Sequence, residues 1–192
     1  MTEITAENRT FTQCAGWPRT GCNAFVGCRF ERSQFLQADV SGCTFEDCVF
    51  EDCDLSLLQV KSASFKNVRF MRCKLQGVSF YEASHLLFTV AFAECQLNFV
   101  SFNGMILKKT LFDNCSLRDA VFTLANVTAS SFVRCDLARA VFQHTVLDKA
   151  DLSTAYNFVI DPDTNSLKKT RFSLYGLPGL LEKYQIEIEE MA

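Results

Sequence analysis

Apolar residues recur at every fifth position through the middle of the chain. They are Phe25, Phe30, Phe35, Val40, Phe45, Phe50, Leu55, Val60, Phe65, Phe70, Leu75 and Phe80, then, after a slip of two residues, Leu87, Phe92, Leu97, Phe102, Leu107, Phe112, Leu117, Phe122, Val127, Phe132, Leu137, Phe142, Leu147 and Leu152. A helix repeats every 3.6 residues and a flat strand every 2, so neither explains a period of five. A fixed short period is typical of a solenoid, in which each unit buries its apolar side by stacking on its neighbours.

The residues just before these apolar positions follow a pattern of their own. A small residue often stands two places before, and Asp one place before, as in Cys53-Asp54-Leu55, Cys135-Asp136-Leu137 and Ala150-Asp151-Leu152. In this pattern and period the chain resembles the pentapeptide-repeat family. The resemblance implies an all-β fold, a right-handed quadrilateral β-helix with four pentapeptides in each coil.

Four units per coil would place residues 20 apart on one face, and the sequence supports this arrangement. We name the four faces after their first apolar residue: the Phe25, Phe30, Phe35 and Val40 faces. The predicted core columns of two faces are Phe30, Phe50, Phe70, Phe92, Phe112 and Phe132 on one, and Leu55, Leu75, Leu97, Leu117 and Leu137 on the next. The columns stay continuous only if residues 81–86 contain two extra residues, which predicts a local bulge there and not a domain boundary.

The same pattern divides one single domain, residues 1–192, into three parts. Residues 1–24 break the period and are expected to form an N-terminal cap, with Phe11 and Trp17 covering the open end of the core. Residues 25–152 form the repeats, about six and a half coils or roughly 31 Å at about 4.8 Å per layer. Residues 153–192 form a C-terminal cap and dimerisation segment.

Ten cysteines raise the question of a metal or redox site. Half of them stand two places before the leucine column and are expected to form one buried row: Cys53, Cys73, Cys95, Cys115 and Cys135. A zinc site needs ligands that converge on one point, whereas a straight row of parallel thiols does not converge. We therefore predict that these cysteines act as small core residues, with metal binding and redox chemistry as the less favoured alternatives.

The chain offers no recognisable catalytic constellation. His85 lies within the bulge and is expected to pack or hydrogen-bond locally, and His144 is expected to point outward. We predict that the protein is not an enzyme and uses no cofactor, metal or small-molecule substrate. With a net charge of −3, no basic and apolar leader at the N-terminus and no long apolar stretch, it is expected to be a cytoplasmic protein that does not enter membranes.

Charged residues cluster in blocks that the 20-residue spacing brings together. An acidic belt, defined as Glu46, Asp47, Glu51, Asp52 and Asp54, precedes a basic block that runs from Lys61 to Lys74. Stacking predicts that Glu46 lies beside Lys66, Asp52 beside Arg72, Asp54 beside Lys74, and Asp119 beside Arg139. These acids can form cross-strand ion pairs, or the belt can be a surface that a basic partner recognises.

The C-terminal segment resembles the cap of the albicidin-resistance members of the family. The similar stretches are Arg171-Phe172-Ser173-Leu174, Leu177 to Tyr184, and Ile186-Glu187-Ile188. The resemblance implies a short helix and a strand that form a tail-to-tail homodimer. Pro178 suits the first turn of a helix. The predicted interface residues are Leu177, Leu180, Leu181, Tyr184, Ile186 and Ile188. A cap that folds back on its own coil is the alternative.

The resemblance also implies a function. Quinolone-resistance, albicidin-resistance and microcin-immunity members protect type II topoisomerases with rods that mimic DNA, so the first hypothesis is a protein-binding solenoid that shields DNA gyrase through the acidic belt. Residues 25–152 carry nearly equal numbers of acidic and basic residues, so mimicry by overall charge is not supported. Direct nucleic-acid binding ranks lowest.

The alternative function is a scaffold or adaptor with another protein partner. It would use the Val40 face, whose outward residues are mostly uncharged: Ser41, Ser62, Ser79, Ser101, Asn103, Gly104 and Thr123.

Overall fold

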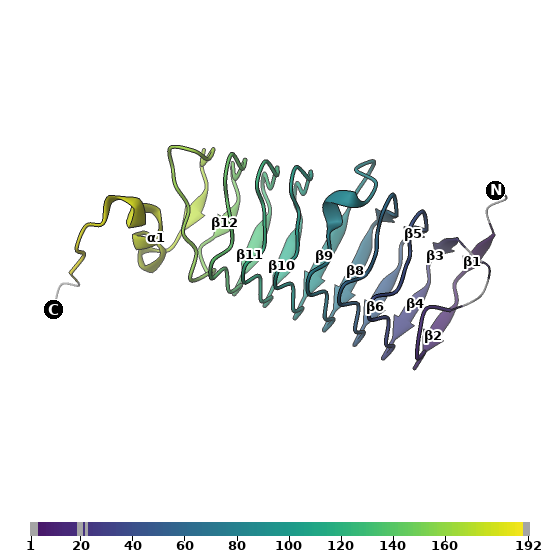
Figure 1. Ribbon diagram of the computed structural model, residues 1–192. Helices are drawn as coiled ribbons and strands as arrows, with labels where there is room; N and C mark the ends of the chain where they lie inside the picture. Colours follow the sequence, from purple (N-terminus) through teal and green to yellow (C-terminus); the bar gives the residue numbers. More distant parts are fainter. Residues whose placement is uncertain (1–3, 19–20, 22, 190–192) are drawn as a thin grey trace.

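The computed structural model describes residues 4–18, 21 and 23–189 as a parallel β-solenoid of about 8 turns (Figure 1). Successive coils stack in one direction along the rod, and a short helix follows the last coil at the C-terminal end. The all-β quadrilateral fold class is thereby confirmed. The stacked coils extend beyond residues 25–152, because Thr5 pairs with Ala24 and Leu152 pairs with Phe172.

Two of the four faces contain regular strands, and every pairing is parallel. The sheet on the Phe25 face consists of β1 (Thr5–Glu7), β3 (Ala24–Val26), β5 (Thr44–Glu46) and β7 (Ser64–Lys66). The sheet on the Phe30 face runs β2 (Thr10–Thr12), β4 (Arg29–Glu31), β6 (Val49–Glu51), β8 (Val68–Met71), β9 (Val90–Ala93), β10 (Leu111–Asp113), β11 (Ser131–Val133), β12 (Asp151–Leu152) and β13 (Arg171–Phe172). The Phe35 and Val40 faces pair through single bridges such as Gln34 with Asp54 and Asp39 with Gln59.

The register between coils follows the predicted step and changes at the bulge. Phe50 pairs with Phe70, as a coil of four pentapeptides requires, whereas Phe70 pairs with Phe92 across a longer coil. The regular step still holds where the Ser84 N–H donates to the Ala63 carbonyl, and it is two residues longer where Val68 pairs with Val90. The two extra residues therefore lie between these points, after the 3-10 helix η1 (Phe80–Glu82). At the N-terminal end the coil is one residue shorter than the regular step, since Phe11 pairs with Phe30.

The prediction that Leu87 continues the buried ladder after the bulge is wrong. Leu87 is 65% exposed and has φ 54°, so its side chain leaves the core at a turn. Phe88 is buried instead and packs edge-on against Phe65 and Phe80. Because the turn is longer, the inward-facing position moves by one residue, from Leu87 to Phe88.

The corners of the coils impose an unusual backbone conformation. The residue two places after a buried centre has positive φ in most coils, for example Asp47 (53°), Arg72 (51°) and Lys149 (59°). Residues other than glycine rarely adopt this region. Each corner is held by the next coil, as when the Asp47 N–H donates to the Lys66 carbonyl at 3.0 Å.

Stacked aromatic rings fill the centre of the rod. On the Phe30 face, consecutive rings lie nearly parallel, with centroids 5.3 Å apart for Phe92 and Phe112 and 4.9 Å apart for Phe112 and Phe132. At the N-terminal end, Phe11 stacks on Phe30 at 5.0 Å and Trp17 stacks on it at 5.4 Å. These two side chains cover the end of the core as expected.

The C-terminal end is closed by a compact helical segment. It comprises η2 (Leu174–Gly176), α1 (Pro178–Leu181) and η3 (Glu182–Tyr184). Gly179 lies against Phe158 so closely that a Cβ atom would come within 2.1 Å of the Phe158 carbonyl oxygen. The expected strand after the helix does not form, since residues 186–189 have no ladder partner in the described chain. A segment becomes a β-strand only where a neighbouring edge supplies its backbone partners.

Candidate functional site

The acidic belt is one band around a single coil, not a line along the rod. Glu46 and Asp47 lie on the Phe25 face, Glu51 and Asp52 on the Phe30 face, and Asp54 on the Phe35 face. The register between coils therefore places the basic side chains of the following coil directly beside these carboxylates. A charged partner would meet this band from the side, across two corners of the rod.

Most of the belt is paired with cations or donors. Glu46 lies 3.7 Å from the Lys66 Nζ, and Asp52 accepts from the Arg72 Nε at 2.7 Å. Glu51 receives the Arg29 Nη2 at 2.6 Å and also bonds Arg72. Asn67 Nδ2 donates to Asp47 at 2.6 Å. The Asp54 carboxylate accepts the Ser56 N–H at 3.0 Å while its backbone pairs with Lys74.

Three of the four predicted cross-coil pairs form ion pairs, namely Glu46 with Lys66, Asp52 with Arg72 and Asp119 with Arg139. Asp54 and Lys74 lie side by side through a backbone bridge, but no ion pair joins them among the described residues. The hydrogen bond from Arg72 lowers the pKa of Asp52, and the bonds from Asp52 and Glu51 raise the pKa of Arg72. Exposed pairs of this kind contribute about 0–1 kcal/mol each. Three of the five belt carboxylates, those of Glu46, Glu51 and Asp52, therefore have cationic partners, and these surface pairs can be exchanged at small cost.

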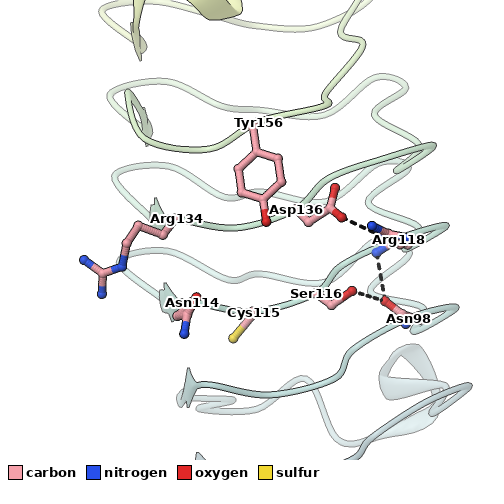
Figure 2. Close-up of a pocket in the computed structure, with 8 residues that line it drawn as sticks. All are labelled: Asn98, Asn114, Cys115, Ser116, Arg118, Arg134, Asp136 and Tyr156. Carbon is pink, nitrogen blue, oxygen red and sulfur yellow. Dashed lines mark hydrogen bonds and ion pairs between the residues drawn. The ribbon is translucent and has the colours of Figure 1, made fainter.

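A polar hollow of about 350 Å³ lies over the Phe35 face (Figure 2). Figure 2 shows Asp136 on its wall, joined to Arg118, which in turn bonds Asn98. The Asp136 carboxylate accepts from the Arg118 Nε at 2.6 Å, the Asn157 Nδ2 at 2.9 Å and the Ala138 N–H at 3.1 Å.

Burial acts to raise the pKa of Asp136, but the bonds from Asn157, Arg118 and the Ala138 amide outweigh it, so the pKa is lowered. The Asp136 side chain is only 7% exposed, whereas Arg118 is 54% exposed. The sequence pattern had indicated only that Asp136 occupies the usual Asp place before a central leucine. Nothing along the chain showed that Arg118 and Asn157 would surround it.

The predicted cysteine row is buried on the Phe35 face. Cys53, Cys73, Cys95, Cys115 and Cys135 are all at most 2% exposed. Each thiol donates to a backbone carbonyl, as from Cys53 to the Phe30 oxygen at 3.3 Å and from Cys135 to the Phe112 oxygen at 3.4 Å. On the neighbouring face, burial raises the pKa of the Cys48 thiol to about 11. A thiol in this setting is a poor nucleophile. Cys22 lies outside the described residues.

The two histidines stand apart from other reactive groups. His85 is exposed in the bulge, where its Nε2 lies 3.1 Å from the Tyr81 carbonyl oxygen, and His144 is exposed at a corner. Within residues 4–18, 21 and 23–189, no group of three or more His, Cys, Asp or Glu side chains has the arrangement of a metal site. No described helix has the length and apolar character needed to cross a membrane.

The C-terminal segment exposes several large apolar side chains. Leu177 is 41% exposed, Tyr184 56%, Ile186 55% and Ile188 52%. Leu180 packs against the core instead. A hollow of about 380 Å³ lies between the helix and the tail, lined by Pro178, Leu181, Glu182, Gln185, Ile186 and Ile188. Five of the six predicted interface residues therefore face solvent or this hollow, and one is used within the chain.

Family models match most of the repeats. A model described as pentapeptide repeat region matches residues 23–89, and one described as pentapeptide repeats (8 copies) matches residues 95–132 and 120–156. A curated relative, the quinolone resistance pentapeptide repeat protein QnrB96 of Scandinavium goeteborgense, is 27% identical over 140 residues. The match covers 71% of this chain and 57% of the relative, so the chain spans little more than half of that protein's length.

Two solved structures of trypsin-treated QnrB1, described as a plasmid-mediated fluoroquinolone resistance protein, are similar in shape. One superposes with a TM-score of 0.73 at 20% identity and covers 97% of this chain and 92% of its own. The other has a TM-score of 0.64 at 17% identity and covers 97% and 98%. At such identities the likeness establishes a shared fold.

Proposed function

Because the chain belongs to the pentapeptide-repeat family, we propose that it is a non-enzymatic, protein-binding solenoid that protects a type II topoisomerase, DNA gyrase in the first place, from a toxin or antibiotic. The observation that carries this proposal is the 27% identity to a quinolone resistance protein over 71% of the chain. The matching fold of trypsin-treated QnrB1 along nearly the whole rod supports it.

We place the contact with the topoisomerase on the acidic belt. Its corner residues Asp47 and Asp52 are exposed, and the ion pairs that Glu46 forms with Lys66 and Asp52 forms with Arg72 are of the weak surface kind. A basic partner surface can therefore replace Lys66 and Arg72 as the counter-charge without a large penalty. Duplex DNA carries one charge about every 1.7 Å along its axis, whereas this belt circles one coil. Mimicry of DNA in this protein is thus confined to a local acidic band.

A supercoiling assay tests the proposal. Titrating the protein into a gyrase reaction stopped by a fluoroquinolone or by albicidin is expected to restore supercoiling at protein levels that do not inhibit the enzyme. Asp52→Lys, which turns the belt corner basic, should raise the concentration needed for rescue by about tenfold, equivalent to about 1.4 kcal/mol. Glu94→Lys, at the same corner two coils along, is the matched control and should rescue normally.

If the wild-type protein and the Asp52→Lys variant rescue supercoiling equally well, the contact with the enzyme does not lie on the acidic belt. No rescue and no inhibition by the wild-type protein would overturn the protective role for this enzyme. The scaffold function would then take its place. That alternative has one structural observation in its favour: the Val40 face presents exposed Leu124 and Val141, 60% and 43% exposed, beside its polar residues.

We further propose that two copies associate through the C-terminal cap. The open hollow beside Leu181, Ile186 and Ile188 offers the partner copy a seat in which apolar side chains lie next to Glu182 and Gln185, and the tail offers a backbone edge. Such a contact would satisfy both the exposed side chains and the free N–H and C=O groups of the tail.

Replacing Ile186 and Ile188 together with Asp is expected to convert a dimer into a monomer, because two charges would enter the apolar interface. Light scattering after size-exclusion chromatography at micromolar concentration measures this directly. Ile4→Asp, at the opposite end and equally exposed at 52%, should leave the mass unchanged. A wild-type protein that is already monomeric at this concentration would favour the fold-back cap.

A further inference from the structure

Lysines that are far apart in the sequence cluster on one part of the Phe25 face. Five exposed lysines lie on its last coils: Lys108, Lys109, Lys149, Lys168 and Lys169. The bridges Ile106 to Asn126, Asn126 to Val146 and Val146 to Ser166 stack these coils in register. Residues that are far apart in the chain therefore belong to one surface, which we call the lysine edge.

Three of these lysines project from one corner of the rod. Lys109, Lys149 and Lys169 have φ values of 60°, 59° and 59°, and Ala129 with φ 58° fills the remaining level of the column. Their backbone is held between coils, with the Lys109 N–H donating to the Thr128 carbonyl at 3.0 Å and the Lys149 N–H to the Lys168 carbonyl at 2.8 Å. At about 4.8 Å per coil, the row is straight and roughly 14 Å long.

Among the described residues, the five lysines of the edge form none of the cross-coil ion pairs found elsewhere on the rod. Arginines on other faces pair across coils, as Arg72 does with Asp52 and Arg139 with Asp119. The ion pairs found between described residues include Lys66 and Lys183 but none of the five lysines of the edge.

One acid lies among the five lysines. Asp148 accepts from the Ser166 hydroxyl at 2.7 Å and from the Lys168 N–H at 3.0 Å. The bond from Ser166, followed by the Lys168 amide and the nearby lysine charges, lowers its pKa, so it is ionised at neutral pH. The five lysines and the single Asp148 carboxylate leave this surface with a net excess of four positive charges. A local excess of this size attracts anions even though the whole protein carries a net charge of −3.

We propose that the lysine edge binds the phosphate backbone of duplex DNA. A polyphosphate backbone presents negative charges in a row, and lysine side chains are flexible point charges suited to phosphate oxygens. The residues between the lysines are small, Thr128 and Ala129, so a backbone can approach the corner without obstruction. The edge lies on the last coils, away from the acidic belt near residue 50, and the inference does not rest on the proposed protection of a topoisomerase.

Fluorescence anisotropy of a labelled duplex of about 20 base pairs, titrated with the full chain, tests this assignment. We expect sequence-independent binding in the range of about 10⁻⁴ to 10⁻⁶ M that weakens steeply between 50 and 200 mM salt. Replacing Lys109, Lys149 and Lys169 together with Gln should reduce the salt slope by about 3, because each lysine that binds a phosphate adds about one to the slope.

The matched control replaces three exposed cations outside the edge, Lys61, Arg69 and Lys74, with Gln. It removes the same charge and should leave affinity within about twofold and the slope unchanged. Equal losses in both triple variants would show an effect of net charge and overturn the proposal, as would the absence of binding at the lowest salt. If poly-L-glutamate of matched charge displaces the duplex as well as unlabelled DNA does, the edge binds acidic polypeptides and the assignment to nucleic acid is wrong. Thermal unfolding of each variant confirms that the corners still fold.

Discussion

Replacing Phe112 with alanine is expected to lower the free energy of unfolding by about 3–5 kcal/mol. Phe112 is fully buried at the middle of the rod, stacked between Phe92 and Phe132 and packed edge-on against Phe102 and Phe122. The substitution removes the ring and leaves a cavity that the neighbouring coils cannot close, because their spacing is set by the backbone ladder. Urea unfolding followed by circular dichroism measures the loss.

The effect should spread along the rod, since each coil is stabilised only by its neighbours. We expect a broader transition, or two transitions, as the halves on either side of Phe112 become uncoupled. Phe99→Ala is the matched control: the same residue type stands 63% exposed at a corner, and its removal should change stability by no more than about 0.5 kcal/mol. Phe112→Leu should cost less than the alanine variant, since Leu152 already occupies the same column next to Phe172. Similar losses for Phe99→Ala and Phe112→Ala would contradict the stacked core.

The second large effect is expected at Asp136. Replacing it with Asn removes the charge that receives the Arg118 and Asn157 bonds in the polar hollow. Hydrogen bonds to a charged group contribute about 1.5–3 kcal/mol, and Arg118 is half exposed, so water recovers part of that contribution. We expect a loss of about 2 kcal/mol at pH 7, measured by urea unfolding.

The loss should depend on pH. The pKa of Asp136 in the folded protein lies below its ordinary value of 3.8, so the ionised carboxylate stabilises the fold above that value. The contribution disappears as the pH falls through the lower, folded-state pKa, and the gap between wild type and Asp136→Asn should therefore narrow in acid. Asp54→Asn is the matched control, because Asp54 has the same place on the same face but accepts only the Ser56 amide among the described donors. Equal, pH-independent losses at both positions would refute the role of Arg118 and Asn157.

Features that repeat from one coil to the next could be predicted from the sequence. A buried phenylalanine at the same place in successive coils implies the aromatic stack, and the same step pairs Asp52 with Arg72 and Asp119 with Arg139. The burial of the cysteine row follows for the same reason, because a fixed step places each member in the same environment. The break in the period also predicted which coil contains the extra residues of the bulge, but it did not predict the conformation of the turn.

Features that depend on the backbone conformation of a turn could not be predicted from the repeat. Leu87 and Phe88 are equally apolar, and only the positive φ at Leu87 determines that Phe88 enters the core. The expected terminal strand is likewise missing because its pairing edge must come from another part of the structure or another copy.

The period of five is enough to predict the solenoid, its buried columns apart from the position at Leu87, and the pairs of Asp52 with Arg72 and Asp119 with Arg139. A constant period converts distance along the chain into position in space. Which charged side chains find partners, and which do not, depends on the folded arrangement of the coils. Asp136 and Asp54 share one position of the repeat, yet three donors converge on Asp136, whereas among the described donors only the Ser56 amide bonds the Asp54 carboxylate. The lysines of the edge are scattered between residues 108 and 169. They form one surface because the chain returns to the same face once in every coil, which stacks residues about 20 positions apart on one another.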